Sequence, residues 1–355
     1  MNSLRVFVLL FTFALVGCDG KEVRLEFPTP PPPPAPTPLA KLELKPDAEL
    51  EQQIAKIAEE AKGKVGVAAV VLETGESAMF NGDQHFPMQS VYKLPIAMAV
   101  MDQVRRGELD LDAVIGVTKD DFIRPGMHSP LRDKNPNGGE FTIRELIRLS
   151  LVESDGTASD VLMNTAGGAV NVQAFLTQIG IRDISVNNTE KEIGRDWETQ
   201  YENWATPAAG IKILRFVDAQ CNPDRVGETQ QPEELDQDMV TSPDPCFDPK
   251  IAVRPNGDDQ LPNELIEMLQ VSVPGQMRIK GRLPQGLIVA HKTGTSGTRN
   301  GITAATNDIG IISLPNGNHV AIAVFVSDSP ADEKTREAVI AKIAKAAWDR
   351  WTAAN

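Results

Sequence analysis

Ser90 and Lys93 stand three residues apart in the segment QSVYKLP, just ahead of the apolar run IAMAVM. On a helix, this spacing puts both side chains on one face, close enough to interact. A serine hydroxyl becomes a good nucleophile only beside a base, and a lysine can be that base when burial or nearby positive charge lowers its pKa. The pair therefore indicates covalent catalysis through Ser90. The alternative is a helix N-cap followed by a solvated lysine.

Three further stretches could complete such a site. ESDG offers a second hydroxyl at Ser154, HKTGTSG places Lys292 in a strand-like segment, and the acidic stretch beginning NTEKEIG contains Glu190. Each has an ordinary explanation of its own: a turn, a lysine on an edge strand and a charged surface loop. Their joint presence, in this order, indicates one catalytic site.

The ordered set SVYK, SDG and KTG resembles the S-x-x-K, S-D-N and K-T-G signature of penicillin-binding proteins and class A β-lactamases. The stretches FPMQS, TNDIG and EKEI resemble class A in particular, and QYENW its subgroup with an enlarged loop after the catalytic glutamate. The resemblance covers residues 42–355 apart from 217–260. It implies a β-lactam hydrolase that confers antibiotic resistance and needs no cofactor.

The resemblance implies a role for each of four side chains. Ser90 is the expected nucleophile, and Lys93 is expected to activate it and relay protons. Ser154 is expected to pass a proton to the departing β-lactam nitrogen. Glu190 is expected to position and deprotonate the water that releases the acyl-enzyme. Whether Lys93 or Glu190 is the base for acylation stays open at this point.

Substrate contacts follow from the same resemblance. The backbone N–H groups of Ser90 and Thr295 are the expected oxyanion hole, and Lys292 is expected to help hold the substrate carboxylate. Arg278 is a candidate for a second carboxylate ligand, with a solvated arginine as the alternative. His128 falls about where the family has a cleft-lining side chain. The remaining expected substrate contacts are Thr293, Gly294, Ser296 and Gly156.

Two glycines depart from the family pattern. Gly156 stands where the motif usually has an asparagine, so we expect one hydrogen-bond donor fewer and a wider cleft. Gly194 stands where many members have an asparagine that helps hold the hydrolytic water. Another group must then hold this water, or deacylation is slow.

The N-terminus predicts export and anchoring. A basic start and a 12-residue apolar run indicate a signal peptide over residues 1–17, because the run is too short to span a membrane. The ending LVGC resembles a lipobox, which implies a lipidated Cys18; an ordinary cleavage site is the alternative. The proline-rich stretch within 18–40 predicts a semi-rigid spacer, or else a disordered tail. The expected location is the periplasm, on a membrane through this lipid anchor.

The remaining pattern predicts an α+β fold. Amphipathic helices are expected over 47–64 and 332–351, and strands lie near both ends of the folded part. Residues 41–88 and 276–355 therefore build one antiparallel β-sheet domain flanked by N- and C-terminal helices. Residues 89–275 form an all-helical inserted domain. The expected architecture is that of serine β-lactamases and transpeptidases.

The helical domain includes a polar, proline-rich insert at about 217–260. It contains Cys221 and Cys246, which predict a disulfide in an exported protein; two free thiols are the alternative.

Composition excludes other classes of function. The chain has 355 residues and a net charge of −14, which argues against nucleic acid as a partner. The chain has four histidines, and it contains neither an HExxH nor a CxxC motif, which argues against a metal site. We expect a monomer acting on a small-molecule β-lactam. The rival functions are a penicillin-binding cell-wall peptidase or transpeptidase, and a non-catalytic β-lactam-binding lipoprotein.

Overall fold

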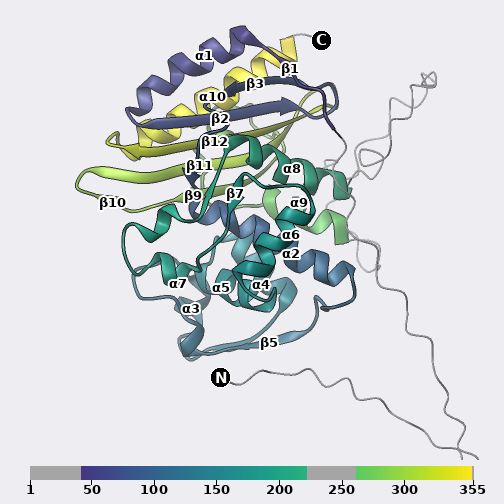
Figure 1. The fold of residues 1–355 in the computed structure, drawn as a ribbon, viewed down its shortest axis with the longest axis vertical. Helices are drawn as coiled ribbons and strands as arrows, with labels where there is room; N and C mark the ends of the chain where they lie inside the picture. The colour runs from purple at the N-terminus through teal and green to yellow at the C-terminus, as the bar shows by residue number, and fades with distance from the viewer. Residues whose placement is uncertain (1–40, 222–260, 354–355) are drawn as a thin grey trace, which may run out of the picture. The chain divides into compact units, whose positions relative to one another are not determined.

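The computed structural model describes residues 41–221 and 261–353 (Figure 1). The predicted signal peptide, lipidated Cys18, spacer and Cys221–Cys246 disulfide depend on residues or side chains outside this description.

A mixed sheet dominates one half of the described chain. Its strands run in the order β1-β3-β2-β12-β11-β10, and β9 pairs with β11. All the pairs are antiparallel except β1 with β3. The strands are β1 (Lys45–Pro46), β2 (Lys64–Val71), β3 (Glu76–Phe80), β9 (Val289–Thr295), β10 (Thr298–Arg299), β11 (Ile302–Ser313) and β12 (His319–Ser329).

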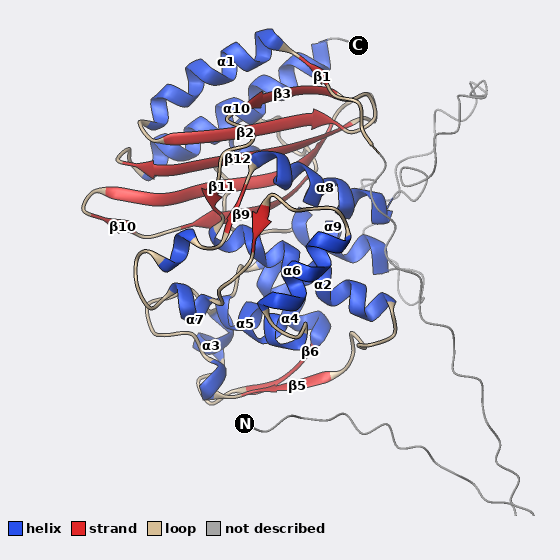
Figure 2. Ribbon diagram, viewed as in Figure 1, coloured by secondary structure: helices blue, strands red, loops and turns tan. Residues whose placement is uncertain are grey.

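Helices cover both faces of this sheet (Figures 1 and 2). Because successive side chains of a strand point to opposite faces, the apolar run of β12 supplies two separate cores. Val320, Ile322, Val324 and Val326 pack in a core with α1 (Ala48–Ala58) and α10 (Glu333–Ala353). The alternate residues, such as Phe325, pack in the core shared with α8 (Pro207–Cys221) and the other helices.

The helical half is built around α2 (Lys93–Arg105), whose residues 93–102 are all buried. Its neighbours include α4 (Ile143–Val152), α5 (Gly156–Thr165), α6 (Ala169–Gln178) and α9 (Leu261–Gln270). Shorter elements are α3 (Pro130–Lys134), α7 (Glu190–Ile193) and the 3₁₀ turns η1 (Glu59–Ala61), η2 (Gln89–Tyr92), η3 (Lys119–Asp121), η4 (Thr199–Tyr201) and η7 (Ile279–Arg282).

The predicted α+β architecture is confirmed, with two differences of detail. Short strand pairs interrupt the helical part: β5 (Val114–Val117) with β6 (Gly139–Thr142), and β8 (Trp204–Ala205) with both β4 (Phe86–Pro87) and β7 (Ile184–Ser185). Residues 217–221 are the end of helix α8, so the irregular insert begins later than its composition indicates. Across 41–221 and 261–353, no helix has the length and apolarity needed to cross a bilayer.

Candidate active site

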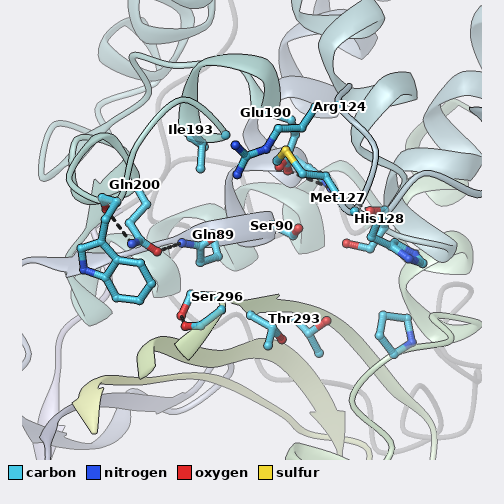
Figure 3. A pocket seen from close by; sticks show the side chains of 18 of the residues that line it. Gln89, Ser90, Arg124, Met127, His128, Glu190, Ile193, Gln200, Thr293 and Ser296 are labelled. Carbon is cyan, nitrogen blue, oxygen red and sulfur yellow. Dashed lines mark hydrogen bonds and ion pairs between the residues drawn. The ribbon is translucent and has the colours of Figure 1, made fainter. Parts of the chain in front are cut away.

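A cavity of about 550 Å³ lies between strand β9 and the helical half (Figure 3). It brings together the four predicted catalytic side chains, Ser90, Lys93, Ser154 and Glu190, from three separate segments of the chain. Of the predicted substrate contacts, His128, Thr293, Thr295 and Ser296 also line it, whereas Lys292, Gly156, Gly294 and Arg278 do not.

Ser90 lies in η2, the 3₁₀ turn that leads into α2. The residue before it, Gln89, has a φ of 48°, a left-handed conformation that is strained for a side-chain-bearing residue. Asn307 of β11 fixes this segment to the sheet by donating hydrogen bonds to the carbonyls of Pro87 (2.8 Å) and Met88 (3.1 Å). The surrounding structure therefore holds Ser90 in a fixed place on the cavity floor.

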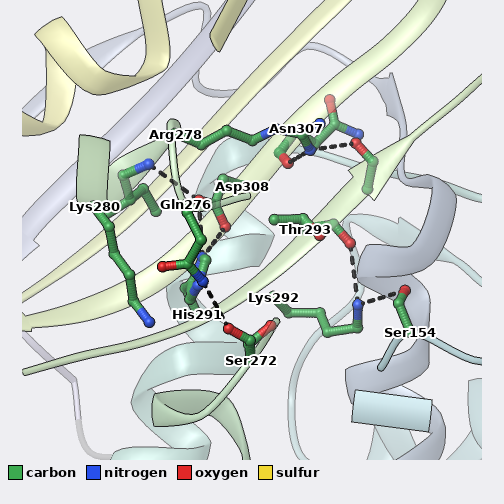
Figure 4. A network of polar contacts seen from close by, with 12 residues as sticks. Ser154, Ser272, Gln276, Arg278, Lys280, His291, Lys292, Thr293, Asn307 and Asp308 are labelled. Carbon is green, nitrogen blue, oxygen red and sulfur yellow. Dashed lines mark hydrogen bonds and ion pairs between the residues drawn. The ribbon is translucent and has the colours of Figure 1, made fainter. Parts of the chain in front are cut away.

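Ser154 links the two lysines of the site. Lys93 Nζ donates to the Ser154 carbonyl at 2.7 Å, and Lys292 Nζ donates to Ser154 Oγ at 2.9 Å (Figure 4). Ser154 has a φ of 59°, a second left-handed residue at the site. Its neighbour Asp155 caps α5 by accepting from the Ala158 N–H at 2.8 Å, which anchors the turn.

Both lysines are buried, Lys93 at 2% exposure and Lys292 at 0%. Lys93 Nζ forms an ion pair with Glu190 Oε1 at 3.0 Å. Burial, followed by repulsion from Lys93, holds the pKa of Lys292 well below its usual value. The site thus places two amines beside two hydroxyls, with the charge of Lys93 balanced by Glu190 and the charged form of Lys292 disfavoured in the free enzyme.

Glu190 opens α7, and Asp160 of α5 holds that helix in place. Asp160 accepts hydrogen bonds from the N–H groups of Glu190 (2.6 Å) and Lys191 (3.0 Å). Burial, together with the nearby Glu190 charge, raises the pKa of Asp160 to about 7. The neighbouring carboxylate of Glu192 accepts from the Thr189 N–H at 2.9 Å and so caps the helix. Of the two glutamates, Glu190 is the one that lines the cavity.

Comparison with known proteins agrees with this geometry. The family model described as "Beta-lactamase enzyme family" matches residues 49–225 and 257–351. β-Lactamase VEB-1 of Pseudomonas aeruginosa is 35% identical over 300 residues, which cover 84% of this chain and 89% of the relative. Extended-spectrum β-lactamase PER-1 of the same organism is 33% identical, over 84% and 86% of the two chains. The chain belongs to the class A β-lactamases.

Solved structures support the same assignment. A β-lactamase from Chitinophaga pinensis matches with a TM-score of 0.73 at 36% identity, over 86% of this chain and all of the other. TLA-3 extended-spectrum β-lactamase matches equally well, over 86% and 98%. The protein is therefore a β-lactam hydrolase of the kind that confers antibiotic resistance. Class A β-lactamases are typically exported proteins.

Arg278 of this β-lactamase is 3% exposed, so the alternative of a solvated arginine is wrong. Its guanidinium pairs with Glu337 of α10 at 3.1 Å and donates to the carbonyls of Gly294 and Asn307 at 3.2 and 2.9 Å (Figure 4). A further bond of 2.8 Å reaches Thr295 Oγ1. Arg278 thus stabilises the end of β9 through Gly294 and Thr295, and of these residues Thr295 lines the cavity whereas Arg278 does not.

Two predicted contact residues are glycines at positions where a Cβ would come very close to neighbouring atoms. A Cβ on Gly294 would lie 2.2 Å from the Met88 carbonyl, so glycine lets β9 approach the segment that carries Ser90. A Cβ on Gly156 would lie 2.6 Å from Ile123 Cδ1 and 3.2 Å from Glu190 Cγ. The expectation that Gly156 widens the cleft is therefore wrong, because Ile123 fills that space.

We expect Gly156→Ala to destabilise the fold by about 1–3 kcal/mol, the usual cost of overpacking a well-filled site. Ile123 is 1% exposed and cannot move into solvent to make room. Gly116→Ala is the matched control, since a Cβ at Gly116 meets nothing within 4 Å. Urea unfolding of both variants measures the difference; equal midpoints would contradict the packing argument.

Sequence reasoning missed several residues that line the cavity. Gln200 donates from Nε2 to the Trp197 carbonyl at 2.6 Å and accepts from Gln89 at 2.8 Å, and so ties the loop after Glu190 to the nucleophile segment. The stretch QYENW contains Gln200 and was a usable signal. Arg124 and Met127 come from an irregular segment without a motif, and no sequence pattern indicated them.

Proposed function

We propose that this β-lactamase acts through an acyl-enzyme on Ser90, with Glu190 directing the water that releases it. The observation that carries the proposal is the Lys93–Glu190 ion pair, which lies on the wall of the cavity that Ser90 also lines. Both chemical steps need a proton acceptor beside the serine, and this pair supplies one.

In acylation, Ser90 Oγ bonds to the β-lactam carbonyl carbon and gives its proton to the Lys93–Glu190 pair. The contact of 3.0 Å lets a proton pass between the two groups, so either can hold it afterwards. The ring C–N bond then breaks, the nitrogen takes a proton from Ser154, and Ser154 regains one from the Lys93–Glu190 pair, which thereby returns to its starting protonation state. Lys292 already donates to Ser154 Oγ, which leaves the hydroxyl hydrogen free to point at the departing nitrogen.

In deacylation, water oxygen bonds to the ester carbonyl carbon while Glu190 takes one of its protons. Collapse of the tetrahedral intermediate breaks the bond to Ser90 Oγ, which recovers a proton, and the opened product leaves. The backbone N–H groups of Ser90 and Thr295 would bind the developing oxyanion. A single donor of this kind typically contributes about 10²–10³ in kcat.

Turnover separates the proposal from its rivals. Purified mature protein should hydrolyse nitrocefin over many turnovers, and Ser90→Ala should abolish hydrolysis with the melting temperature unchanged. A single stoichiometric burst would indicate a penicillin-binding peptidase instead. No reaction at all would indicate a non-catalytic binder.

We also propose that Cys18 carries the lipid that anchors the exported protein to a membrane. The wild type should partition with membranes on cell fractionation, and Cys18→Ala should be released into the soluble fraction with the same specific activity. Equal partitioning of the two proteins would refute the anchor.

A further inference from the structure

Arg124 is a cavity residue to which the mechanism above gives no task. It lines the same cavity as Ser90, Lys93 and Glu190, and its side chain is exposed to that space. The guanidinium makes no hydrogen bond or ion pair with any residue in 41–221 or 261–353, so its five N–H donors are available. Figure 3 shows Arg124 on the Glu190 side of the cavity, above Ser90.

Gly194 makes room for this side chain. The Gly194 N–H donates to the Glu190 carbonyl at 2.9 Å, so the glycine ends the short helix that Glu190 begins. A Cβ on Gly194 would lie 2.6 Å from Met127 Sδ and 3.2 Å from Arg124 Nε. Met127 and Arg124 therefore occupy the place where a side chain at Gly194 would stand, one helical turn from the catalytic carboxylate.

The segment that carries Arg124 is held firmly. Arg132 Nη1 donates to the carbonyls of Ile123 (3.0 Å) and Arg124 (2.9 Å), and its Nη2 donates to that of Met127 (3.0 Å). The Met127 N–H closes a turn by donating to the Arg124 carbonyl at 3.2 Å. The backbone of Arg124 is thus fixed beside α7, while its charged end is left free to bind something in the cavity.

We propose that Arg124 is a positioning residue for deacylation, holding the hydrolytic water against Glu190. This inference rests on the acyl-enzyme mechanism proposed above. The guanidinium donates a hydrogen bond to one lone pair of the water, and the water donates one hydrogen to Glu190. The second lone pair then faces the ester carbon, where the new C–O bond forms as Glu190 takes the proton and the bond to Ser90 Oγ breaks.

The chemistry of arginine suits this role. A guanidinium stays protonated throughout, so it cannot compete with Glu190 as the base. Its positive charge favours the negative charge that develops on the water oxygen as the proton leaves. Acylation uses the serine hydroxyl and no bulk water, so Arg124 should affect the second chemical step alone.

The test compares Arg124→Gln with Arg195→Gln in the full mature protein. Arg195 lies outside the cavity, its side chain is 71% exposed, and its long ion pair with Glu192 measures 3.8 Å. Arg195→Gln therefore removes one positive charge, as Arg124→Gln does, without changing the cavity. With benzylpenicillin, Arg124→Gln should lower kcat and KM together by about 10- to 100-fold, as expected for one lost charged hydrogen bond. The ratio kcat/KM should stay constant, and intact mass should show acyl-enzyme accumulating during turnover.

A second variant restores a hydrogen-bond donor to the water, supplied from position 194 instead of position 124. Arg124→Gln and Met127→Ala combined with Gly194→Asn remove the Met127 Sδ that would lie 2.6 Å from the new Cβ and place an amide in that space, and this variant should recover part of kcat. Equal kcat for Arg124→Gln and Arg195→Gln would overturn the inference. So would a fall in kcat/KM accompanied by a lower melting temperature, which indicates a merely structural role.

Substrate recognition is the remaining alternative, and a matched pair of penicillins detects it. If Arg124→Gln impaired only α-carboxybenzylpenicillin and left benzylpenicillin unaffected, Arg124 would bind a substrate anion and the inference would be wrong. These outcomes are separate from a failure of the proposed mechanism, which Glu190→Gln tests without reference to Arg124.

Discussion

Glu190→Gln should react with a penicillin once and then stall, leaving a stoichiometric adduct on Ser90. Glutamine keeps the size of the side chain but cannot take a proton from water. General base catalysis typically contributes about 10²–10⁴ in rate, and deacylation should slow by that factor. Acylation should continue because Lys93, released from its ion pair with Glu190, takes the Ser90 proton. Intact mass spectrometry after mixing with excess penicillin measures the adduct directly.

Glu192→Gln is the control for this experiment, because it removes the same charge two residues away. The Glu192 carboxylate bonds to Thr189 and caps α7, and it does not line the cavity. We expect this variant to keep most of its turnover and lose only a little stability from the weakened cap. If Glu192→Gln accumulated the acyl-enzyme while Glu190→Gln turned over normally, Glu192 and not Glu190 would be the base for deacylation. If neither variant accumulated the acyl-enzyme, the proposed mechanism would be rejected.

The catalytic side chains could be predicted because each stands in a short motif whose internal spacing determines its local structure. Ser90 and Lys93 share one helical face, and Lys292 was indicated by the resemblance of its segment to the K-T-G motif. The strands were equally predictable, since β2 and β12 contain long apolar runs. Local patterns such as these carry most of the fold.

The supporting contacts could not be predicted, because they join residues far apart in the chain. Arg278 is buried where Glu337, 59 residues later, pairs with it at 3.1 Å and two backbone carbonyls accept from its guanidinium. Asp160 accepts a hydrogen bond from the backbone N–H of Glu190, which lies 30 residues later in the chain. Gly156 was expected to open space, whereas the side chain of Ile123 packs against it and fills that space. Composition and periodicity contain no record of which distant residue meets which.

Lys292→Met should lower kcat/KM for benzylpenicillin by about 30- to 4000-fold, the range expected when one partner of a buried charge pair is removed. We expect Lys292 to help hold the substrate carboxylate although it is 0% exposed, because its Nζ donates at 2.9 Å to Ser154 Oγ, which lines the cavity. Methionine fills a similar volume without charge. Benzylpenicillin methyl ester, which lacks that carboxylate, should be hydrolysed about equally by the variant and the wild type. The wild type should prefer the free acid, and the variant should lose the preference.

Lys280→Met is the matched control, since Lys280 is a part-buried lysine outside the cavity, with Nζ 3.1 Å from the Gln270 carbonyl.

Lys292→Met also separates an effect on function from an effect on stability. Burial and the charge of Lys93 hold the pKa of Lys292 well below its ordinary value, so its ammonium form is disfavoured in the free enzyme. Removing that charge should leave the melting temperature unchanged or raise it, even as activity falls.

The lowered pKa also predicts that kcat/KM of the wild type declines as pH rises through a range below 10.5, because the neutral amine no longer attracts the carboxylate. Lys292→Met should lack this alkaline decline. If it kept both the decline and the preference for the free acid, another cation would have to hold the carboxylate, and Arg278 acting through Thr295 would be the next to test.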